Sequence, residues 1–263
     1  MNGPGTGELV ICPLSIVPLR KEASDRSEQV SQWLFGETAE VLERAPKWSL
    51  IRCDHDGYEG WVDNKQVHPL AHDPHPDMRV LEQGAFIDMM DYQVRLPYGA
   101  ALPAYEDGQI IWDGGPIGVE ARVNENLPSD REAVIELLVH PFLGAPYLWG
   151  GRTPWGVDCS GLTQMVHLLM GIYLPRDAAQ QVEEGEPVEF VELTRTGDLA
   201  FFDNEDGRIV HVGIVLAPLE GTDEHRIVHA SGRVRMDTLD QQGIFLRERK
   251  GYSHRLRVIR RIV

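Results

Sequence analysis

The sequence lacks a long apolar run and a recognisable export segment. No uninterrupted apolar stretch approaches the roughly 18 to 20 residues that a helix needs to span a bilayer. The first seven residues, Met1–Gly7, contain neither the basic nor the apolar region of a signal peptide. We therefore expect no membrane span. We expect a cytoplasmic protein as the sequence is written, or a periplasmic or cell-surface protein if an export signal has been removed.

Positive charge is also scarce. Lys and Arg number 25 against 41 Asp and Glu, which gives a formal net charge of -16 at pH 7. A protein of this sign repels a phosphate backbone rather than neutralising it, so we expect no nucleic-acid partner. The 263 residues are 42% hydrophobic, which is enough to build one to three compact domains.

Cysteine is rare as well, with only Cys12, Cys53 and Cys159 in the chain. Three widely spaced cysteines without a C-x-x-C unit exclude a disulfide framework and give no zinc-binding or redox motif. Cys12 and Cys53 both lie in apolar, strand-like surroundings, where a free thiol behaves as a small buried hydrophobe. Cys159 has different neighbours and is the candidate for chemistry.

Short β-type runs fill the first 125 or so residues. Apolar and polar residues roughly alternate over 38–44 and 48–53, a hairpin connection joins them at 45–47, and a third strand follows at 60–62. With the G-x-x-G-W turn at Gly57–Trp61, residues 9–70 resemble the bacterial SH3-like domain. The resemblance implies one small all-β barrel, and we place this domain at residues 1–72.

A proline-rich segment follows at residues 69–77, and we place a boundary there near Asp73. His68, His72 and His75 lie around this segment, but its prolines prevent a helix that would gather them on one face, so we expect no metal site. Strand-like runs at 78–81, 85–90, 94–96, 109–112 and 118–123, with a turn at 113–116, predict a second, divergent SH3-like barrel over residues 73–126.

The pattern changes to helix after Pro128. Ser129 and Glu132 have the spacing of a capping box, and further helices are expected at 159–170 and 177–184. The remaining runs, at 199–202, 209–216, 227–230 and 256–263, read as strands. Helices followed by an antiparallel sheet predict an α+β domain over residues 127–263.

Cys159 stands at the start of the second of these helices. The unpaired N–H groups and the positive dipole end of a helix N-terminus stabilise a thiolate, so we expect the pKa of Cys159 to move down from about 8.5 toward neutrality. The same N–H groups can face a developing oxyanion. Residues 156–161 do not form the nucleophile elbow of a serine hydrolase, because Asp158 occupies the position at which the G-x-S-x-G motif requires serine.

Two histidines are placed to serve this thiol. His211 lies inside an apolar strand, and His229 ends the next one, so antiparallel pairing can bring their imidazoles together. His211 would then act as general base and acid, with His229 orienting it. Each histidine alone has a plainer interpretation as an inert, hydrogen-bonded strand residue.

Residues 130–263 resemble the NlpC-type, papain-like peptidases of bacterial cell-wall turnover. The resemblance rests on an aromatic-x-W-G-G loop, a D-C-S-G helix start, an H-V-G-I strand and an I-H-A-S-like strand, found in that order at Tyr147–Gly151, Asp158–Gly161, His211–Ile214 and Val228–Ser231. It implies a papain-like α+β catalytic domain preceded by two small all-β SH3-like barrels. It also implies that Cys159 is the nucleophile, His211 the base and His229 the orienting residue.

The resemblance extends to substrate contacts. Tyr147 and Asp158 match substrate-binding positions, and a carboxylate at Asp158 would suit an ammonium group; its alternative role is to cap the Cys159 helix. Ser160 is a further candidate, since its hydroxyl or backbone N–H could bond the glutamate carboxylate. An L-P-R-x-x-x-Q match makes Arg176 or Asp177 candidates to line the cleft, with helix capping as the alternative for Asp177. Tyr58 and Glu28 of the SH3-like domain are candidates to close the cleft, although Tyr58 has the alternative of packing on a neighbouring tryptophan.

The resemblance therefore implies a cysteine endopeptidase that hydrolyses γ-D-glutamyl-L-diamino acid bonds in peptidoglycan stem peptides with a free N-terminal L-Ala, in murein recycling or remodelling. The resemblance implies no cofactor and no metal, peptidoglycan-derived peptides as the partners, and we expect a monomer. Two alternatives stay open. One is a thiol acyltransferase or amidase on the same scaffold, and the other is a catalytically inert wall-binding protein.

Overall fold

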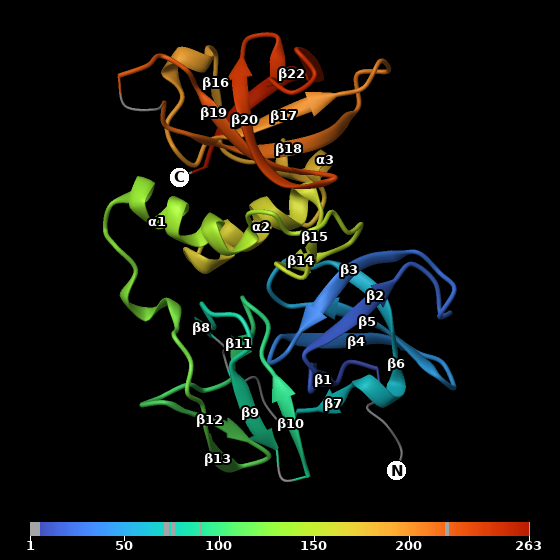
Figure 1. The fold of residues 1–263 in the computed structure, drawn as a ribbon. Coiled ribbons are helices and arrows are strands. Elements are labelled where there is room, and N and C mark those ends of the chain that lie inside the picture. The colour runs from blue at the N-terminus through green and yellow to red at the C-terminus, as the bar shows by residue number, and fades with distance from the viewer. Residues whose placement is uncertain (1–5, 71–73, 75–76, 90, 219–220, 263) are drawn as a thin grey trace. The chain divides into compact units, whose positions relative to one another are not determined.

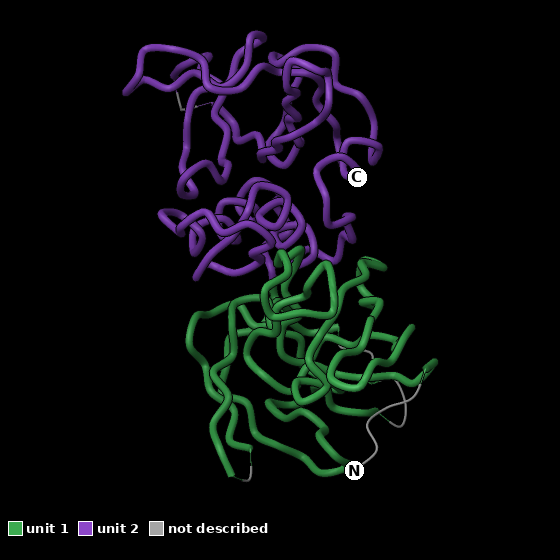
Figure 2. Tube along the Cα trace, turned by 90° about the vertical axis from the view of Figure 1, so that its right-hand side faces the viewer, with its two compact units in different colours: residues 1–126 green, residues 127–263 purple. Residues whose placement is uncertain are grey.

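The computed structural model describes residues 6–70, 74, 77–89, 91–218 and 221–262. The chain divides into two compact units, residues 1–126 and 127–263 (Figure 2). The predicted boundary at Asp73, the histidines His72 and His75, and the predicted strand ends at Met90 and Val263 lie outside the described residues. Among the described residues, no helix is both long and apolar enough to cross a bilayer.

The first unit begins with a seven-stranded antiparallel sheet in the order β3-β2-β6-β5-β4-β1-β7 (Figure 1). The predicted hairpin at 45–47 is present, since Ala45 N–H donates to the Trp48 carbonyl across it. Cys12 and Cys53 are buried free thiols in the core of this sheet, as the sequence predicted. The strands are β1 Leu9–Ile11, β2 Ile16–Arg20, β3 Gln29–Leu34, β4 Thr38–Arg44, β5 Trp48–Cys53, β6 Glu59–Asp63 and β7 His68–Pro69, with a 3-10 turn η1 at Asn64–Gln66.

The described strands in the rest of the first unit pair in three two-stranded sheets around a second apolar core, to which Phe35 also contributes. The predicted strand over 118–123 is wrong. Asp113 and Gly114 alone make the turn, with φ of 50° and 76°, so the returning strand already starts at Gly115. The elements are β8 Met78–Arg79, β9 Phe86–Met89, β10 Tyr92–Arg95, β11 Ala101–Leu102, β12 Gln109–Trp112, β13 Gly115–Gly118 and η2 Asn124–Asn126.

The second unit carries its helices first and its main sheet afterwards (Figure 1). This sheet runs β16-β22-β17-β18-β19-β20-β21, and an additional pairing of β21 with β22 closes strands β17–β22 into a six-stranded barrel. Helix α2 packs against β18. The strands are β14 Arg152–Thr153, β15 Gly156–Val157, β16 Glu186–Val188, β17 Leu199–Asp203, β18 Ile209–Leu216, β19 Arg226–Ser231, β20 Arg233–Asp240, β21 Gly243–Leu246 and β22 Gly251–Arg261.

The helices of this unit differ from the prediction at their ends. They are α1 Arg131–Val139, α2 Cys159–Leu169 and α3 Ala178–Gln181, with 3-10 turns η3 His140–Phe142 and η4 Val191–Leu193. The predicted capping box of Ser129 and Glu132 is wrong. Asp130 is the N-cap, because its carboxylate accepts a bond from Ala133 N–H at 3.0 Å. Helix α3 ends at Gln181 rather than at residue 184.

Candidate active site

The chain around Cys159 is held by unusually close backbone contacts. Asp158 caps α2 by accepting a bond from Gly161 N–H at 2.7 Å, which leaves Cys159 as the first helical residue. A Cβ atom at Gly161 would lie 2.2 Å from the carbonyl oxygen of Gly151, so only glycine lets the 146–151 loop lie against the start of the helix. Cys159 itself is 7% exposed. The nucleophile candidate is therefore fixed in position and largely covered.

Asp158 is the centre of a buried polar network. Its Oδ2 accepts from Gly150 N–H at 2.8 Å and from Arg176 Nη2 at 2.7 Å, and its Oδ1 accepts from Arg176 Nη1 at 3.0 Å. Arg176 Nη1 also donates to Ser160 Oγ at 3.0 Å. Arg176 is 1% exposed, so it pairs with the carboxylate in the interior. Asp158 therefore caps the Cys159 helix, which is one of its two predicted roles, and Arg176 balances the negative charge of the Asp158 carboxylate.

Replacing Arg176 by leucine is expected to lower the free energy of unfolding by about 3–5 kcal/mol, because the Asp158 carboxylate would stay buried without its cation. Urea denaturation followed by far-UV circular dichroism measures this. The exposed Arg208→Leu serves as the matched control and is expected to change stability by less than about 0.5 kcal/mol. An Arg176→Leu cost no larger than that of the control would contradict the assignment.

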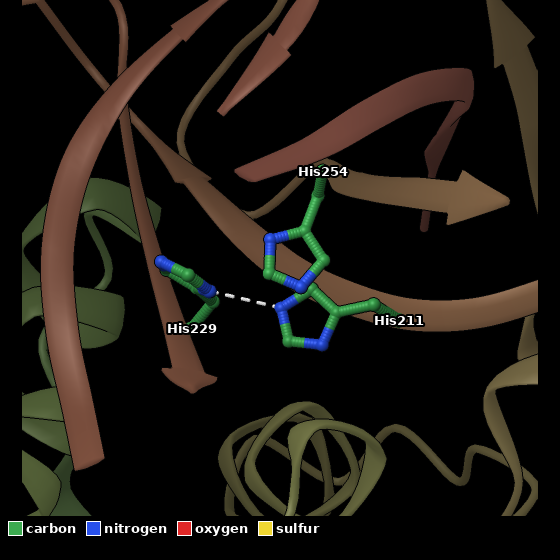
Figure 3. A group of neighbouring side chains, drawn as sticks. All are labelled: His211, His229 and His254. Carbon is green, nitrogen blue, oxygen red and sulfur yellow. Dashed lines mark hydrogen bonds between the residues drawn. The ribbon is translucent and has the colours of Figure 1, made fainter. Parts of the chain in front are cut away.

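A chain of hydrogen bonds leads away from His211. His211 Nε2 lies 2.9 Å from His229 Nδ1 (Figure 3), and His229 Nε2 lies 3.0 Å from Asp237 Oδ2. Arg235 donates two bonds to the same carboxylate, at 2.6 and 2.9 Å. Burial raises the pKa of the Asp237 carboxyl group. The bonds from His229 and Arg235 outweigh burial and lower this pKa below its usual value.

The ionised Asp237 carboxylate assigns the tautomers of both imidazoles. It can only accept, so His229 donates Nε2–H to it and presents an unprotonated Nδ1. His211 must then donate Nε2–H to His229, which leaves its own Nδ1 as a lone pair. That nitrogen is the acceptor that the Cys159 proton needs.

A third imidazole lies on this pair. His254 stacks on His211 with ring centroids 4.2 Å apart and an interplanar angle of 20° (Figure 3). Burial, followed by the neighbouring His254 and His229, holds the pKa of His211 well below its usual value. Burial and His229 also lower the pKa of His254, to about 4. His211 is therefore a neutral base at physiological pH.

The expected low pKa of Cys159 is wrong for this structure. Burial, together with the nearby Asp158 carboxylate, raises the pKa of the Cys159 thiol to about 11. The N–H groups of Val212 and Ser160 and the Arg176 cation act in the opposite direction, but burial outweighs them. The Cys159 thiol and the His211 imidazole are therefore both neutral in the resting site.

Alkylation of Cys159 by iodoacetamide is expected to accelerate continuously from pH 6 to pH 10. A raised thiol pKa means that the thiolate fraction is small at neutral pH and grows with pH, while His211 stays neutral throughout. Mass spectrometry of the peptide that contains Cys159 measures the rate at each pH. A rate that is already at its plateau below pH 7 would indicate a thiolate–imidazolium pair and contradict the neutral pair.

The other predicted site residues belong to different units: three lie in the second unit, and Tyr58 lies in the first. Tyr147 is 37% exposed, and burial, Cys159 and Asp158 raise the pKa of its phenol to about 12, so it lies near the thiol and stays protonated. Ser160 is buried and bonded to Arg176. Asp177 is exposed at the N-cap of α3, where its N–H donates to Gln180 Oε1 at 3.4 Å. Tyr58 belongs to the first unit and packs against the core of its sheet.

The sequence analysis missed Asp237 and His254. Asp237 lies on β20, where other charged residues surround it in the sequence, so nothing distinguished it from a solvent-exposed carboxylate. His254 lies on the part of β22 that precedes the predicted start of this strand. Strand pairing places these two residues at the site, but it could be used only after the strands were known. In β19 and β20, for example, His229 pairs with Arg235, which puts Asp237 two residues further along the same face.

Comparisons with known proteins place these features in a family. A model described as the NlpC/P60 family matches residues 144–249, and one described as a bacterial dipeptidyl-peptidase Sh3 domain matches residues 19–67. A gamma-D-glutamyl-L-lysine dipeptidyl-peptidase of Bacillus subtilis is 30% identical over 203 residues, 70% of this chain and 68% of that one. A protein of the same name from Bacillus cereus is 27% identical, over 71% of this chain and 64% of that one.

The fold has a solved counterpart. The crystal structure of an NlpC/P60 family protein from Bacillus cereus superposes with a TM-score of 0.77 and covers 96% of this chain and 99% of that one. The sequence identity of 19% makes this a likeness of fold. This chain thus spans about two thirds of the length of its curated relatives and nearly all of one solved structure.

Proposed function

The chain belongs to the NlpC/P60 family of cysteine peptidases, and on that premise we propose that it hydrolyses γ-D-glutamyl-diamino acid bonds in peptidoglycan stem peptides. The observation that carries the chemistry is the hydrogen-bonded series His211–His229–Asp237, on strands of the barrel whose β18 packs against the Cys159 helix. The names of the relatives support the bond and the substrate class.

The geometry supports a two-stage acyl transfer. The Cys159 proton passes to His211 Nδ1 as the sulfur attacks the γ-carbonyl carbon, and the oxygen becomes an oxyanion facing the N-terminal N–H groups of α2. Collapse breaks the amide bond, and His211 gives its proton to the leaving amine of the diamino acid. His211 then takes a proton from water, which attacks the thioester and regenerates the Cys159 thiol.

Tyr147 is a candidate to support the same step. The Tyr147 phenol stays protonated, because its pKa is raised to about 12. Cys159 is near enough to contribute electrostatically to this rise. A protonated phenol in that position is a hydrogen-bond donor for the developing oxyanion. We therefore assign Tyr147 to transition-state stabilisation in addition to substrate contact.

Finer features of the sequence analysis stay as proposals. We propose that the substrate carries a free N-terminal L-Ala, with Asp158, Ser160, Asp177 and Tyr58 as candidate contacts. At Asp158 an ammonium group would share the carboxylate with Arg176, whose two bonds already lie at 3.0 Å or less. A second SH3-like barrel at residues 73–126 is supported by an apolar core that its residues form together with Phe35.

The setting of the reaction is a proposal. We propose murein recycling in the cytoplasm, with periplasmic or cell-surface action as the alternative. Action as a monomer is supported by the origin of Cys159, His211, His229 and Asp237, which all come from residues 127–263 of one chain.

The test is a comparison of isomeric peptides. L-Ala-γ-D-Glu-diaminopimelate, its α-linked isomer and its N-acetylated form are incubated with the full chain, and free diaminopimelate is quantified by mass spectrometry. We expect release from the γ-linked peptide and none from the α-linked isomer. Equal cleavage of both isomers contradicts the bond specificity, and undiminished cleavage of the acetylated form contradicts the requirement for a free alanine amine.

The two alternatives have distinct outcomes in this assay. A thiol acyltransferase would release diaminopimelate but pass L-Ala-γ-D-Glu to an added amine in preference to water, so a new amide of that amine would dominate. An inert wall-binding protein would release nothing.

A further inference from the structure

Three histidines gather at the point where the hydrogen-bonded series begins. His211 of β18 and His229 of β19 point their imidazoles toward each other, and the imidazole of His254 of β22 lies stacked on that of His211 (Figure 3). Each offers one ring nitrogen, and these three atoms lie within 4.8 Å of one another. Nitrogen ligands about 2.1 Å from a tetrahedral zinc ion are about 3.4 Å apart, so a side-chain rotation that unstacks His254 from His211 would bring all three nitrogens to one ion.

The outer nitrogens of two of these rings are already held. His229 Nε2 is bonded to Asp237 Oδ2 at 3.0 Å, and His254 Nδ1 is bonded to Ser253 Oγ at 2.8 Å. A carboxylate on the far nitrogen of a histidine is the arrangement that supports metal-ligating imidazoles, because it fixes the ring and raises its basicity. The nitrogens left for an ion are His229 Nδ1 and His254 Nε2, next to His211 Nε2.

We propose that His211, His229 and His254 form a regulatory binding site for a borderline transition-metal ion such as Zn²⁺, with water in the fourth position. Imidazole nitrogens suit Zn²⁺, Cu²⁺ and Ni²⁺, whereas Mg²⁺ and Ca²⁺ prefer oxygen. The metal takes the nitrogen with which His211 now bonds His229. This ion inhibits rather than assists the peptidase.

The inhibition follows from the position of one proton. A neutral imidazole carries a single N–H, so when Nε2 of His211 ligates the ion, its proton moves to Nδ1. Nδ1 is then a donor and can no longer accept the Cys159 proton. Removing the ion with a chelator returns the proton to Nε2 and restores the base. This consequence rests on the proposed function, whereas the binding itself does not.

Binding is measured on a chain that cannot turn over. A tag-free Cys159→Ala variant is titrated with Zn²⁺ against a chromophoric chelator and, separately, with Co²⁺ by visible absorption. We expect one ion per chain with a Kd of about 1 μM or tighter. Adding His254→Ala is expected to weaken binding at least tenfold, and adding Asp237→Asn to weaken it by about 10–100-fold. The exposed His140→Ala is the matched control and is expected to leave the Kd unchanged.

Several results would overturn the site. These are absence of stoichiometric binding by Cys159→Ala, binding that survives both His254→Ala and His254→Gln, or equal weakening by His140→Ala. The glutamine variant and a thermal melt of each protein separate loss of a ligand from loss of folding. With the active chain, Zn²⁺ inhibition relieved by a chelator tests the regulatory consequence. Hydrolysis that bound Zn²⁺ leaves unchanged would overturn the regulatory role, whereas absence of hydrolysis without Zn²⁺ would contradict the proposed function.

Discussion

Replacing Cys159 by serine is expected to reduce kcat/KM for γ-D-glutamyl-diamino acid hydrolysis by at least about 10⁴-fold. The thiol is buried and its proton must be taken by one neutral imidazole, and a hydroxyl in the same place has a much higher pKa and cannot form the thioester. Release of the diamino acid, quantified by mass spectrometry under single-turnover and steady-state conditions, measures the loss.

The other two thiols provide the control. Cys12, which follows β1, and Cys53, the last residue of β5, are buried in the core of the first unit, and neither thiol takes part in the reaction proposed for the second. Cys12→Ala and Cys53→Ala are expected to keep kcat/KM within about twofold of the wild type. A loss in either control that equals the loss in Cys159→Ser would contradict the assignment of the nucleophile.

Replacing Asp237 by asparagine is expected to lower kcat by about 10²–10⁴-fold with little change in KM. The amide can donate to His229 Nε2, which moves the His229 proton to Nδ1 and reverses the bond to His211. His211 would then carry its proton on Nδ1, where the Cys159 proton has to go. Asp237 is thus a positioning residue that acts through two imidazoles.

Two further variants separate this role from a structural one. Asp240→Asn changes the same functional group at the end of β20, where Asp240 accepts from the Tyr252 hydroxyl, and it is expected to keep kcat near the wild-type value. Asp237→Glu retains a carboxylate and is expected to recover part of the loss. If the asparagine variant changes KM alone, or if glutamate gives no recovery, the tautomer argument is contradicted.

The parts of the site that could be predicted from the sequence are those that depend on residues close together in the chain or on neighbouring strands. Cys159 follows a helix-capping aspartate and precedes two small residues, so its place at a helix start is readable from four consecutive letters. His211 and His229 were expected to meet because successive apolar strands pair antiparallel, and their 2.9 Å contact follows from that pairing.

The parts that the sequence did not predict depend on burial and on distant strands. Whether a helix-start thiol is acidic is decided by a balance between dipole and desolvation, and only the structure shows that Cys159 is covered. Asp237 and His254 reach the site because β20 and β22 belong to one closed barrel, and the pairing of β21 with β22 that closes it joins segments of unremarkable composition.

The fold shows the same division. The hairpin of β4 and β5 has alternation and a proline turn, and it was predicted at its observed bounds. Strands β2 and β3 were not predicted, because Pro18 interrupts one and polar residues fill the other. In the second unit, α1 starts one residue later than its sequence signal suggested, because Asp130 rather than Ser129 accepts the first N–H bond.

The most direct test of the account is the release of diaminopimelate from L-Ala-γ-D-Glu-diaminopimelate by the wild type and by Cys159→Ala, followed by mass spectrometry. The account predicts equimolar free diaminopimelate and L-Ala-γ-D-Glu from the wild type, and no release above the enzyme-free blank from the variant. Absence of release by the wild type, or equal release by both proteins, would contradict it.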